Sequence, residues 1–211
     1  VLGDNCAGKT TAMRGRCGMF KPSSGRATIA GFDVYKQTEQ IKKNIGYMSQ
    51  KFSLYEDLTV RENIHFFGGI YGLSDKQLKD KSEELVSQLG LQKEIKKLVG
   101  DLPLGWKQKL SFSVAVIHQP KIVFLDEPTG GVDPVARRQF WDLIYEAADK
   151  GTTIFVTTHY MDEAEYCDRI SIMVDGRIKA LDSPSNLKKQ FAAGSMNEVF
   201  FEIARGAQRG E

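Results

Sequence analysis

A glycine-rich run near the start of the chain, residues 3–10, has the composition of a phosphate-binding loop. It fits the pattern G-x-x-x-x-G-K-[ST]. Such a loop lets backbone N–H groups converge on phosphate oxygens, and the helix that follows points its positive end at them. Lys9 adds a charge for the β- and γ-phosphates, and the Thr10 hydroxyl can bind Mg²⁺. We therefore predict that nucleotide phosphates contact Gly3, Asp4, Asn5, Cys6, Ala7, Gly8, Lys9, Thr10 and Thr11.

A second run, residues 122–127, is apolar and ends in two carboxylates, Asp126 and Glu127. A run of this length is typical of a strand buried on both faces, whose last residues lie at the carboxyl edge of a parallel sheet. We expect Asp126 to hold the water shell of a Mg²⁺ ion and Glu127 to polarise the attacking water. A purely structural carboxylate pair would also need a cation or a proton. The combination of both runs indicates nucleotide hydrolysis.

The composition limits the classes of protein to consider. The 211 residues suit one domain with a subdomain, and the net charge of +2 argues against nucleic-acid binding driven by bulk electrostatics. Three scattered cysteines, with no C-x-x-C pair, fit a reducing compartment and no structural zinc. No apolar stretch approaches the roughly eighteen residues that span a bilayer, and no signal peptide is visible. We therefore expect a soluble, cytoplasmic chain with no nucleic-acid partner.

The phosphate loop lies very close to the first residue. Such a loop should follow a buried strand of about five residues, yet only Val1 and Leu2 precede Gly3. There is also no initiating methionine. We therefore expect the natural polypeptide to start earlier and this chain to open within a strand.

Strand and helix patterns alternate along the chain, which predicts an α/β fold. Helices are expected at residues 10–20 and 137–148, and helical periodicity extends over 58–117, where Leu78, Leu85, Val86 and Leu89 share one face. Asp175-Gly176 predicts a tight hairpin turn. The residues from Gly194 onward are expected to be loosely held. Strands are expected at residues 27–31, 44–48, 122–125, 153–157, 169–174 and 177–180.

Further motifs around the helical segment indicate which family of nucleotide hydrolases the chain resembles. The segment ends in Leu-Pro-Leu-Gly-Trp-Lys-Gln at residues 102–108; Gln50 precedes it, Asp133 follows the acidic pair, and His159 follows an apolar strand. In this order the motifs resemble those of the ATP-binding cassette (ABC) ATPases. The resemblance is greatest to cassettes of drug- and antibiotic-exporter type, whose signature often has this form and whose histidine precedes a stretch like residues 160–164. It covers essentially the whole chain.

The resemblance implies a catalytic role for three residues and a fold for the chain. In the family, Glu127 acts as the base, His159 holds the γ-phosphate, and Gln50 senses the Mg²⁺ or the water, so the metal site would comprise Thr10, Gln50 and Asp126. The implied fold is a P-loop NTPase core with a mostly parallel sheet flanked by helices, plus an inserted helical subdomain. The core would comprise residues 1–54 and 119–190, the helical subdomain 55–118, and the C-terminal tail 191–211.

The resemblance also implies partners. Leu102, Gly105 and Gln108 of the signature would contact the γ-phosphate bound by the opposite cassette of a head-to-tail dimer, and Asp133 would reach across the same interface. Such a cassette is the motor of a transporter: its closing on two ATP drives integral membrane permease subunits. We would therefore expect it at the inner face of the cell membrane, with ATP and Mg²⁺ as its ligands.

Several positions depart from the family pattern. Cys6 stands where the family usually has glycine, and Gly15 and Arg16 stand where apolar residues usually face the sheet; a buried arginine without a partner would be costly. Pro103 and Leu104 replace the usual serine and first glycine of the signature, as they do in the exporter subgroup. These departures leave open a regulatory cassette with weak or no hydrolysis, although Glu127 and His159 are intact. A soluble cassette protein acting on ribosomes is a further alternative.

Some of these residues have simpler interpretations. Asp133 followed by proline could cap the next helix, in addition to any interface role. His159 could be an ordinary hydrogen-bonded histidine at the end of a strand. Phe66, Phe67 and Tyr71 could dock a membrane partner, but aromatic residues at helical spacing are more often core residues, and we expect that here.

Overall fold

Three parallel strands form the centre of the molecule. They are β3 (Ile45–Met48), β4 (Ile122–Asp126) and β5 (Thr153–Thr157), arranged in the order β3-β4-β5. Leu2 extends this sheet, because it forms parallel bridges with Thr158, just beyond β5, and with Ile172. The computed structural model describes residues 1–3, 7–20, 23–50 and 54–208.

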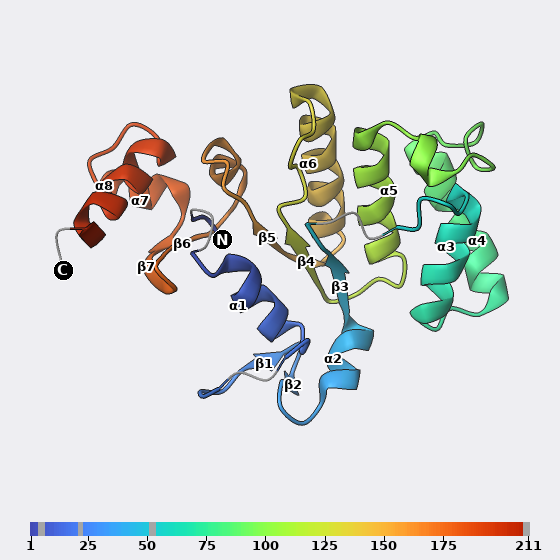
Figure 1. Ribbon diagram of the computed structural model, residues 1–211, viewed down its shortest axis with the longest axis horizontal. Helices are drawn as coiled ribbons and strands as arrows, with labels where there is room; N and C mark the ends of the chain where they lie inside the picture. Colours follow the sequence, from blue (N-terminus) through green and yellow to red (C-terminus); the bar gives the residue numbers. More distant parts are fainter. Residues whose placement is uncertain (4–6, 21–22, 51–53, 209–211) are drawn as a thin grey trace.

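Strand β4 is buried on both faces, as the apolar run predicts. Val123 and Leu125 pack on one side against residues of the helices α5 (Leu104–Val116) and α6 (Pro134–Asp149). Phe124 points to the other side, into a cluster that contains Met13 of helix α1 (Lys9–Arg16). The fold is therefore an α/β fold in which α1 lies on one face of the sheet and α5 and α6 lie on the other (Figure 1).

The segment after the first loop contains more and shorter helices and strands than the sequence predicts. Helix α1 ends at Arg16 rather than near residue 20, because Gly18 adopts a left-handed φ of 71° that a helix cannot continue through. A side chain at position 18 is also excluded, because a Cβ there would lie 2.7 Å from the Thr38 side chain. The antiparallel strands β1 (Thr28–Ile29) and β2 (Phe32–Asp33) follow. Asn44, expected in a strand, ends helix α2 (Thr38–Asn44), which the apolar pattern did not predict because only Ile41 is buried in it.

The long helical segment has a hydrophobic core of its own. It contains α3 (Val60–Ile70), α4 (Asp75–Leu89), the short 3₁₀ helix η1 (Val99–Asp101) and α5. Capping boxes start α3 and α4, in which Thr59 pairs with Glu62 and Ser74 pairs with Gln77. The predicted face of α4 is confirmed, because all its members are buried: Leu78, Leu85, Val86 and Leu89. These helices form one end of the molecule (Figure 1).

The other end of the molecule is built from the C-terminal residues. The short 3₁₀ helix η2 (Asp162–Tyr166) leads into the antiparallel pair β6 (Ile170–Val174) and β7 (Arg177–Asp182). The predicted hairpin turn is confirmed, with φ of 49° at Asp175 and 73° at Gly176. Helices α7 (Pro184–Gln190) and α8 (Met196–Gln208) complete this end (Figure 1).

The expectation that the residues from Gly194 onward are loosely held is wrong for α8. Met196, Val199 and Ile203 lie on one face of this helix and are buried against Leu187 and Ile172. Their spacing of three and four residues is that of an amphipathic helix, a pattern obscured by the polar and glycine residues around it.

Candidate functional site

The phosphate-loop pattern lies where Leu2 passes from the sheet toward α1. A Cβ on Gly3 would collide with the Met173 carbonyl, and Gly8 has a φ of 92°, so both positions require glycine. Helix α1 begins at Lys9, whose buried ammonium donates a 2.7 Å hydrogen bond to the Gly3 carbonyl. The side chain of Lys9 therefore folds back toward Gly3. Three predicted phosphate contacts, Asp4, Asn5 and Cys6, lie outside the described residues.

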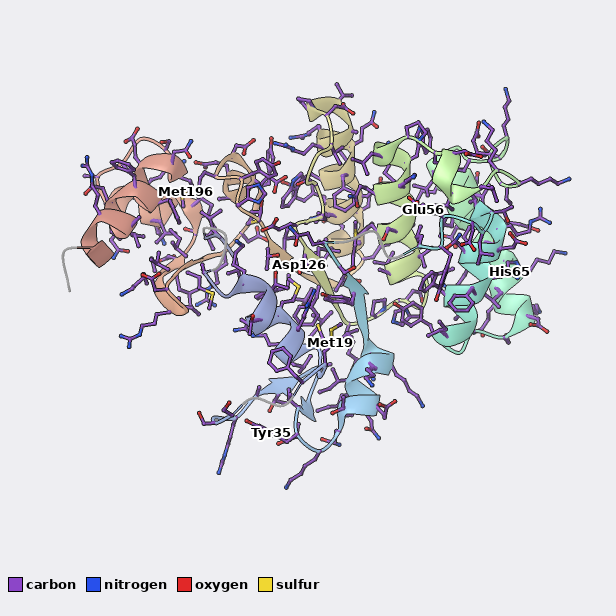
Figure 2. All side chains as sticks on the ribbon, in the orientation of Figure 1. Met19, Tyr35, Glu56, His65, Asp126 and Met196 are labelled. Carbon is purple, nitrogen blue, oxygen red and sulfur yellow. The ribbon has the colours of Figure 1, made fainter. Side chains whose placement is uncertain are left out.

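Asp126 ends β4 with its side chain fully buried near the middle of the molecule (Figure 2). Its Oδ1 atom accepts hydrogen bonds from Thr157 Oγ1 at 2.7 Å and from Thr10 Oγ1 at 3.1 Å. The Oδ2 atom is buried and has no hydrogen-bond partner in the described part of the chain. A buried carboxylate oxygen without a donor is rare and costly, so this atom has the environment of a group that meets a further ligand.

Glu127 is the point where side chains from three other segments converge. Its carboxylate accepts a 3.0 Å hydrogen bond from Gln50 Nε2, and Lys9 Nζ lies 3.5 Å from it. His159 Nδ1 lies 3.1 Å from Glu127 Oε2. Gln50 follows β3 and His159 follows β5, so the carboxyl ends of neighbouring parallel strands bring these groups together at one edge of the sheet.

The backbone of Glu127 is held in an unusual conformation. Its φ is 48°, a left-handed value that costs a non-glycine residue about 1–2 kcal/mol. The Glu127 N–H donates to the Thr157 carbonyl at 3.0 Å and to the Thr157 hydroxyl at 3.2 Å. These bonds hold the residue where its side chain turns back toward Lys9.

Of the predicted metal-site residues, Thr10 and Asp126 contact each other, and Gln50 contacts Glu127 through its Nε2 atom. Mg²⁺ prefers oxygen ligands and is bound through one or two carboxylates together with substrate phosphates. The unpaired Asp126 Oδ2 and the adjacent Thr10 hydroxyl fit that requirement. Among the described residues no group of three or more His, Cys, Asp or Glu side chains could hold a metal by itself. The arrangement therefore fits a Mg²⁺ ion that arrives with a nucleotide.

The signature residues lie on the other face of the sheet from α1. Gly105, in the first turn of α5, packs so closely on α6 that a Cβ would lie 2.8 Å from the Ala136 Cβ. Gln108 is buried, and its Oε1 atom has no hydrogen-bond partner within the described ranges. Leu102 is buried in the hydrophobic core of the helical segment. The structure does not join these residues to the cluster at Glu127.

Asp133 caps helix α6, as its position before Pro134 suggested. Its Oδ1 atom accepts hydrogen bonds from Val135 N and Ala136 N, both at 3.0 Å. The residue is exposed, and its neighbour Val135 keeps 68% of its surface accessible.

A family model described as "ABC transporter" matches residues 1–130. This span contains the glycine-rich loop, the helical segment and the two carboxylates. The chain belongs to the ABC transporter family.

Relatives in this family match over nearly the whole chain. The chain is 45% identical over 204 residues to the "Probable multidrug ABC transporter ATP-binding protein YbhF" of Escherichia coli, covering 97% of this chain and 35% of that protein. It is 40% identical over 194 residues to the human "ATP-binding cassette sub-family A member 2", covering 92% of this chain and 8% of that protein. The chain thus spans about a third or less of these two relatives' length.

Solved structures of the family share the fold. A structure described as the ATP-binding subunit of an ABC transporter superposes with a TM-score of 0.85 at 29% identity, covering 96% of this chain and 85% of that one. The cbiO1 protein of Clostridium perfringens, part of the ABC transporter complex cbiONQ, gives 0.79 at 26% identity, covering 99% and 83%. The fold is the P-loop NTPase α/β fold.

Two features of this ABC chain were not foreseen. Thr157 bonds both Asp126 and the Glu127 backbone, although its only signal in the sequence is its place at the end of a strand before His159. The side chain of Arg16 is only half-buried and has a partner, because its guanidinium lies 5.3 Å from the centre of the Phe155 ring. The cost expected of a buried arginine without a partner therefore does not arise.

In the part of the chain that the structure describes, no helix is long and apolar enough to cross a membrane.

Proposed function

We propose that this chain binds Mg-ATP and hydrolyses it, and that the hydrolysis drives an ABC exporter. The observation that carries the proposal is the convergence of Lys9, Gln50 and His159 on Glu127, beside the unpaired Asp126 Oδ2 atom. The name of the Escherichia coli relative supports the exporter assignment, and because the chain spans only part of that protein, transport belongs to the proposal.

Nucleotide binding rearranges the contacts of Lys9. In the structure the ammonium contacts the Gly3 carbonyl and the Glu127 carboxylate. We assign it to the β- and γ-phosphates, which offer a more concentrated negative charge than either group. Thr10 and Asp126 would hold the Mg²⁺ ion, which neutralises charge on the phosphates.

Hydrolysis then depends on Glu127 as the general base. Its carboxylate accepts a proton from the water whose oxygen attacks the γ-phosphorus, while the bond to the bridging oxygen breaks and ADP leaves. Gln50 orients the carboxylate and the water, and His159 holds the γ-phosphate. The intact cluster favours this function over a regulatory cassette without hydrolysis, and the names of the relatives favour transport over action on ribosomes.

A second cassette completes the site in this proposal. Within one chain, the signature and α1 lie on opposite faces of the sheet. A head-to-tail partner would bring its Gly105 and Gln108 to this chain's phosphates, with Asp133 at the same interface. Two exposed apolar side chains flank these residues, Leu104 at 43% and Val135 at 68% accessibility, and they would be covered in such a dimer.

An exposed aromatic cluster is the proposed docking surface for a membrane permease subunit. Tyr55 and Phe66 keep 47% and 43% of their surfaces accessible and meet edge to face at 5.1 Å; Phe67 stacks beside them. The expectation that Phe66 is a core residue is therefore wrong, although Phe67 and Tyr71 do pack on the helical core. Exposed aromatic residues are the usual anchors of protein interfaces. This contact would hold the chain at the inner face of the membrane.

We also propose that the helical subdomain comprises residues 55–118, between the two parts of the ATPase core.

We expect Phe66→Ser to weaken attachment of the full-length protein to its membrane by roughly tenfold, since burying an aromatic anchor contributes about 1–3 kcal/mol. Sedimentation of membranes from cells making the protein measures the bound fraction. Phe201→Ser is the matched control, because Phe201 is also exposed, at 55%, but lies on α8. Equal attachment of both variants would contradict the docking surface.

Removing Mg²⁺ tests the proposed function directly. ATP with Mg²⁺ at about 100 times its Kd should stabilise the fold by about 2.7 kcal/mol, which raises the Tm by roughly 5–10 °C for a chain of this size. EDTA should remove most of this shift and abolish phosphate release, because Asp126 Oδ2 then has no cation to share with the nucleotide. Thermal unfolding followed by dye fluorescence, with a phosphate assay, measures both; hydrolysis that persists in EDTA would refute the proposal.

A further inference from the structure

Glu163 is a fully buried acid that the proposed mechanism does not use. It lies in η2, with 0% of its surface accessible. Burying a carboxylate costs free energy unless it is hydrogen-bonded, so the hydrogen-bond partners of Glu163 indicate its structural role.

The partners of Glu163 come from two loops and one helix. Thr158 Oγ1 donates to its Oε2 atom at 2.5 Å. Thr129 Oγ1 donates to its Oε1 atom, and Trp141 Nε1 on α6 donates to the same atom at 3.5 Å. Arg137 Nε lies 3.8 Å from that oxygen. Both oxygens therefore accept a hydroxyl hydrogen bond, and each bond comes from a different loop.

Both loops end in residues of the candidate site. Thr129 lies between Glu127 and Asp133, and Gly130 N donates to the Glu127 carbonyl at 3.3 Å. Thr158 directly precedes His159, and its hydroxyl also accepts from Tyr160 N at 3.0 Å. One carboxylate thus fastens the segment after Glu127 to the segment that carries His159.

A second contact joins the same two segments. The Arg137 guanidinium lies over the Tyr160 ring, 4.3 Å from its centre, and pairs with Asp162 at 3.5 Å. Arg137 stands in the first turns of α6, the helix capped by Asp133. The link therefore extends from His159 to the surface where we place the partner cassette.

We infer that Glu163 is a positioning residue for hydrolysis. By holding Thr129 and Thr158 on its two oxygens, it fixes Glu127 and His159 at the 3.1 Å separation of Oε2 and Nδ1, and it couples His159 to the loop of residues 129–133. With none of its surface accessible, Glu163 would act through these two residues and not on the nucleotide itself, and this role rests on the proposed ATP hydrolysis.

The expected effect is on turnover rather than on binding. Glu163→Gln keeps the volume and one acceptor oxygen but removes the negative charge and the second acceptor oxygen, so the hydrogen bond to at least one of the two loops weakens. We expect kcat in the full-length protein to fall about tenfold while KM for ATP and the nucleotide Kd stay within about twofold. Glu165→Gln is the control: Glu165 lies in the same turn but is exposed and pairs with Lys188 at 2.8 Å. It should leave kcat unchanged.

A spectroscopic measurement tests the link without hydrolysis. The chain has three histidines, so His159 can be assigned in NMR spectra by comparison with a His159→Ala variant. Glu163→Gln should shift the His159 ring resonances and broaden them, whereas Glu165→Gln should leave them in place. Unchanged resonances would overturn the inference. If the parent protein shows no hydrolysis but the resonances move, the proposed function fails and the coupling stands.

Two further variants decide the matter if Glu163→Gln does not fold. Thr129→Val and Thr158→Val each remove one hydroxyl donor, and the double variant should lose no more kcat than about the larger of the single losses, because either change already releases the link. Losses that multiply in the double variant would show that the two loops are not coupled through Glu163.

Discussion

Replacing Glu127 with glutamine should slow ATP hydrolysis by roughly 10²–10⁴-fold and leave ATP binding intact. Glutamine keeps the side-chain volume and an oxygen that can accept from Gln50 Nε2, but it cannot take a proton from water. Steady-state phosphate release and equilibrium nucleotide binding measure the two effects.

The same variant should trap a closed dimer, because ATP that is bound but not hydrolysed keeps the two cassettes together. Size-exclusion chromatography with and without ATP would show the shift. Glu202→Gln is the control, since Glu202 is exposed on α8 and pairs only loosely with Arg205 at 3.8 Å. If Glu127→Gln hydrolyses ATP at near the parent rate, Glu127 is not the base.

Replacing Lys9 with methionine should weaken ATP binding by roughly 10²-fold, equivalent to about 2.7 kcal/mol. Methionine fills the space of the lysine stem, so the loss reports the ammonium group. This group is buried and contacts the uncharged Gly3 carbonyl and the Glu127 carboxylate, each of which a phosphate can replace. Isothermal titration calorimetry measures the dissociation constant.

The control for Lys9 is Lys42→Met. Lys42 is exposed on α2 and pairs with its neighbour Glu39 at 2.9 Å, so its loss should leave ATP affinity unchanged. A Lys9 variant that binds ATP within about threefold of the parent would show that phosphate recognition depends on the backbone of the loop alone.

The location of the site residues at the ends of strands could be predicted from the sequence, because a short run of apolar residues determines where each strand lies. The apolar run before Asp126 fixes a strand, and parallel strands place their last residues at one edge, so Gln50 and His159 meet Glu127 there. Helix α8 was missed because its apolar spacing lies among polar and glycine residues, and α2 because it buries a single side chain.

The hydrogen bonds of Glu163 and Thr157 could not be predicted for a different reason. They join side chains far apart in the chain, and nothing local to Thr129 or Thr158 distinguishes a donor to a buried carboxylate from an exposed hydroxyl. Exposure is similarly decided by tertiary packing, which is why Phe66 has the spacing of a core residue but lies at the surface.

The contact between Gly105 and Ala136 limits how the signature can vary. Because a Cβ at position 105 would lie 2.8 Å from the Ala136 Cβ, a larger residue there is tolerable only if α6 changes with it. The residues of the signature and of the first turns of α6 should therefore be exchanged together in protein engineering. A chimera that imports the signature of another cassette should import the matching residues of α6 as well.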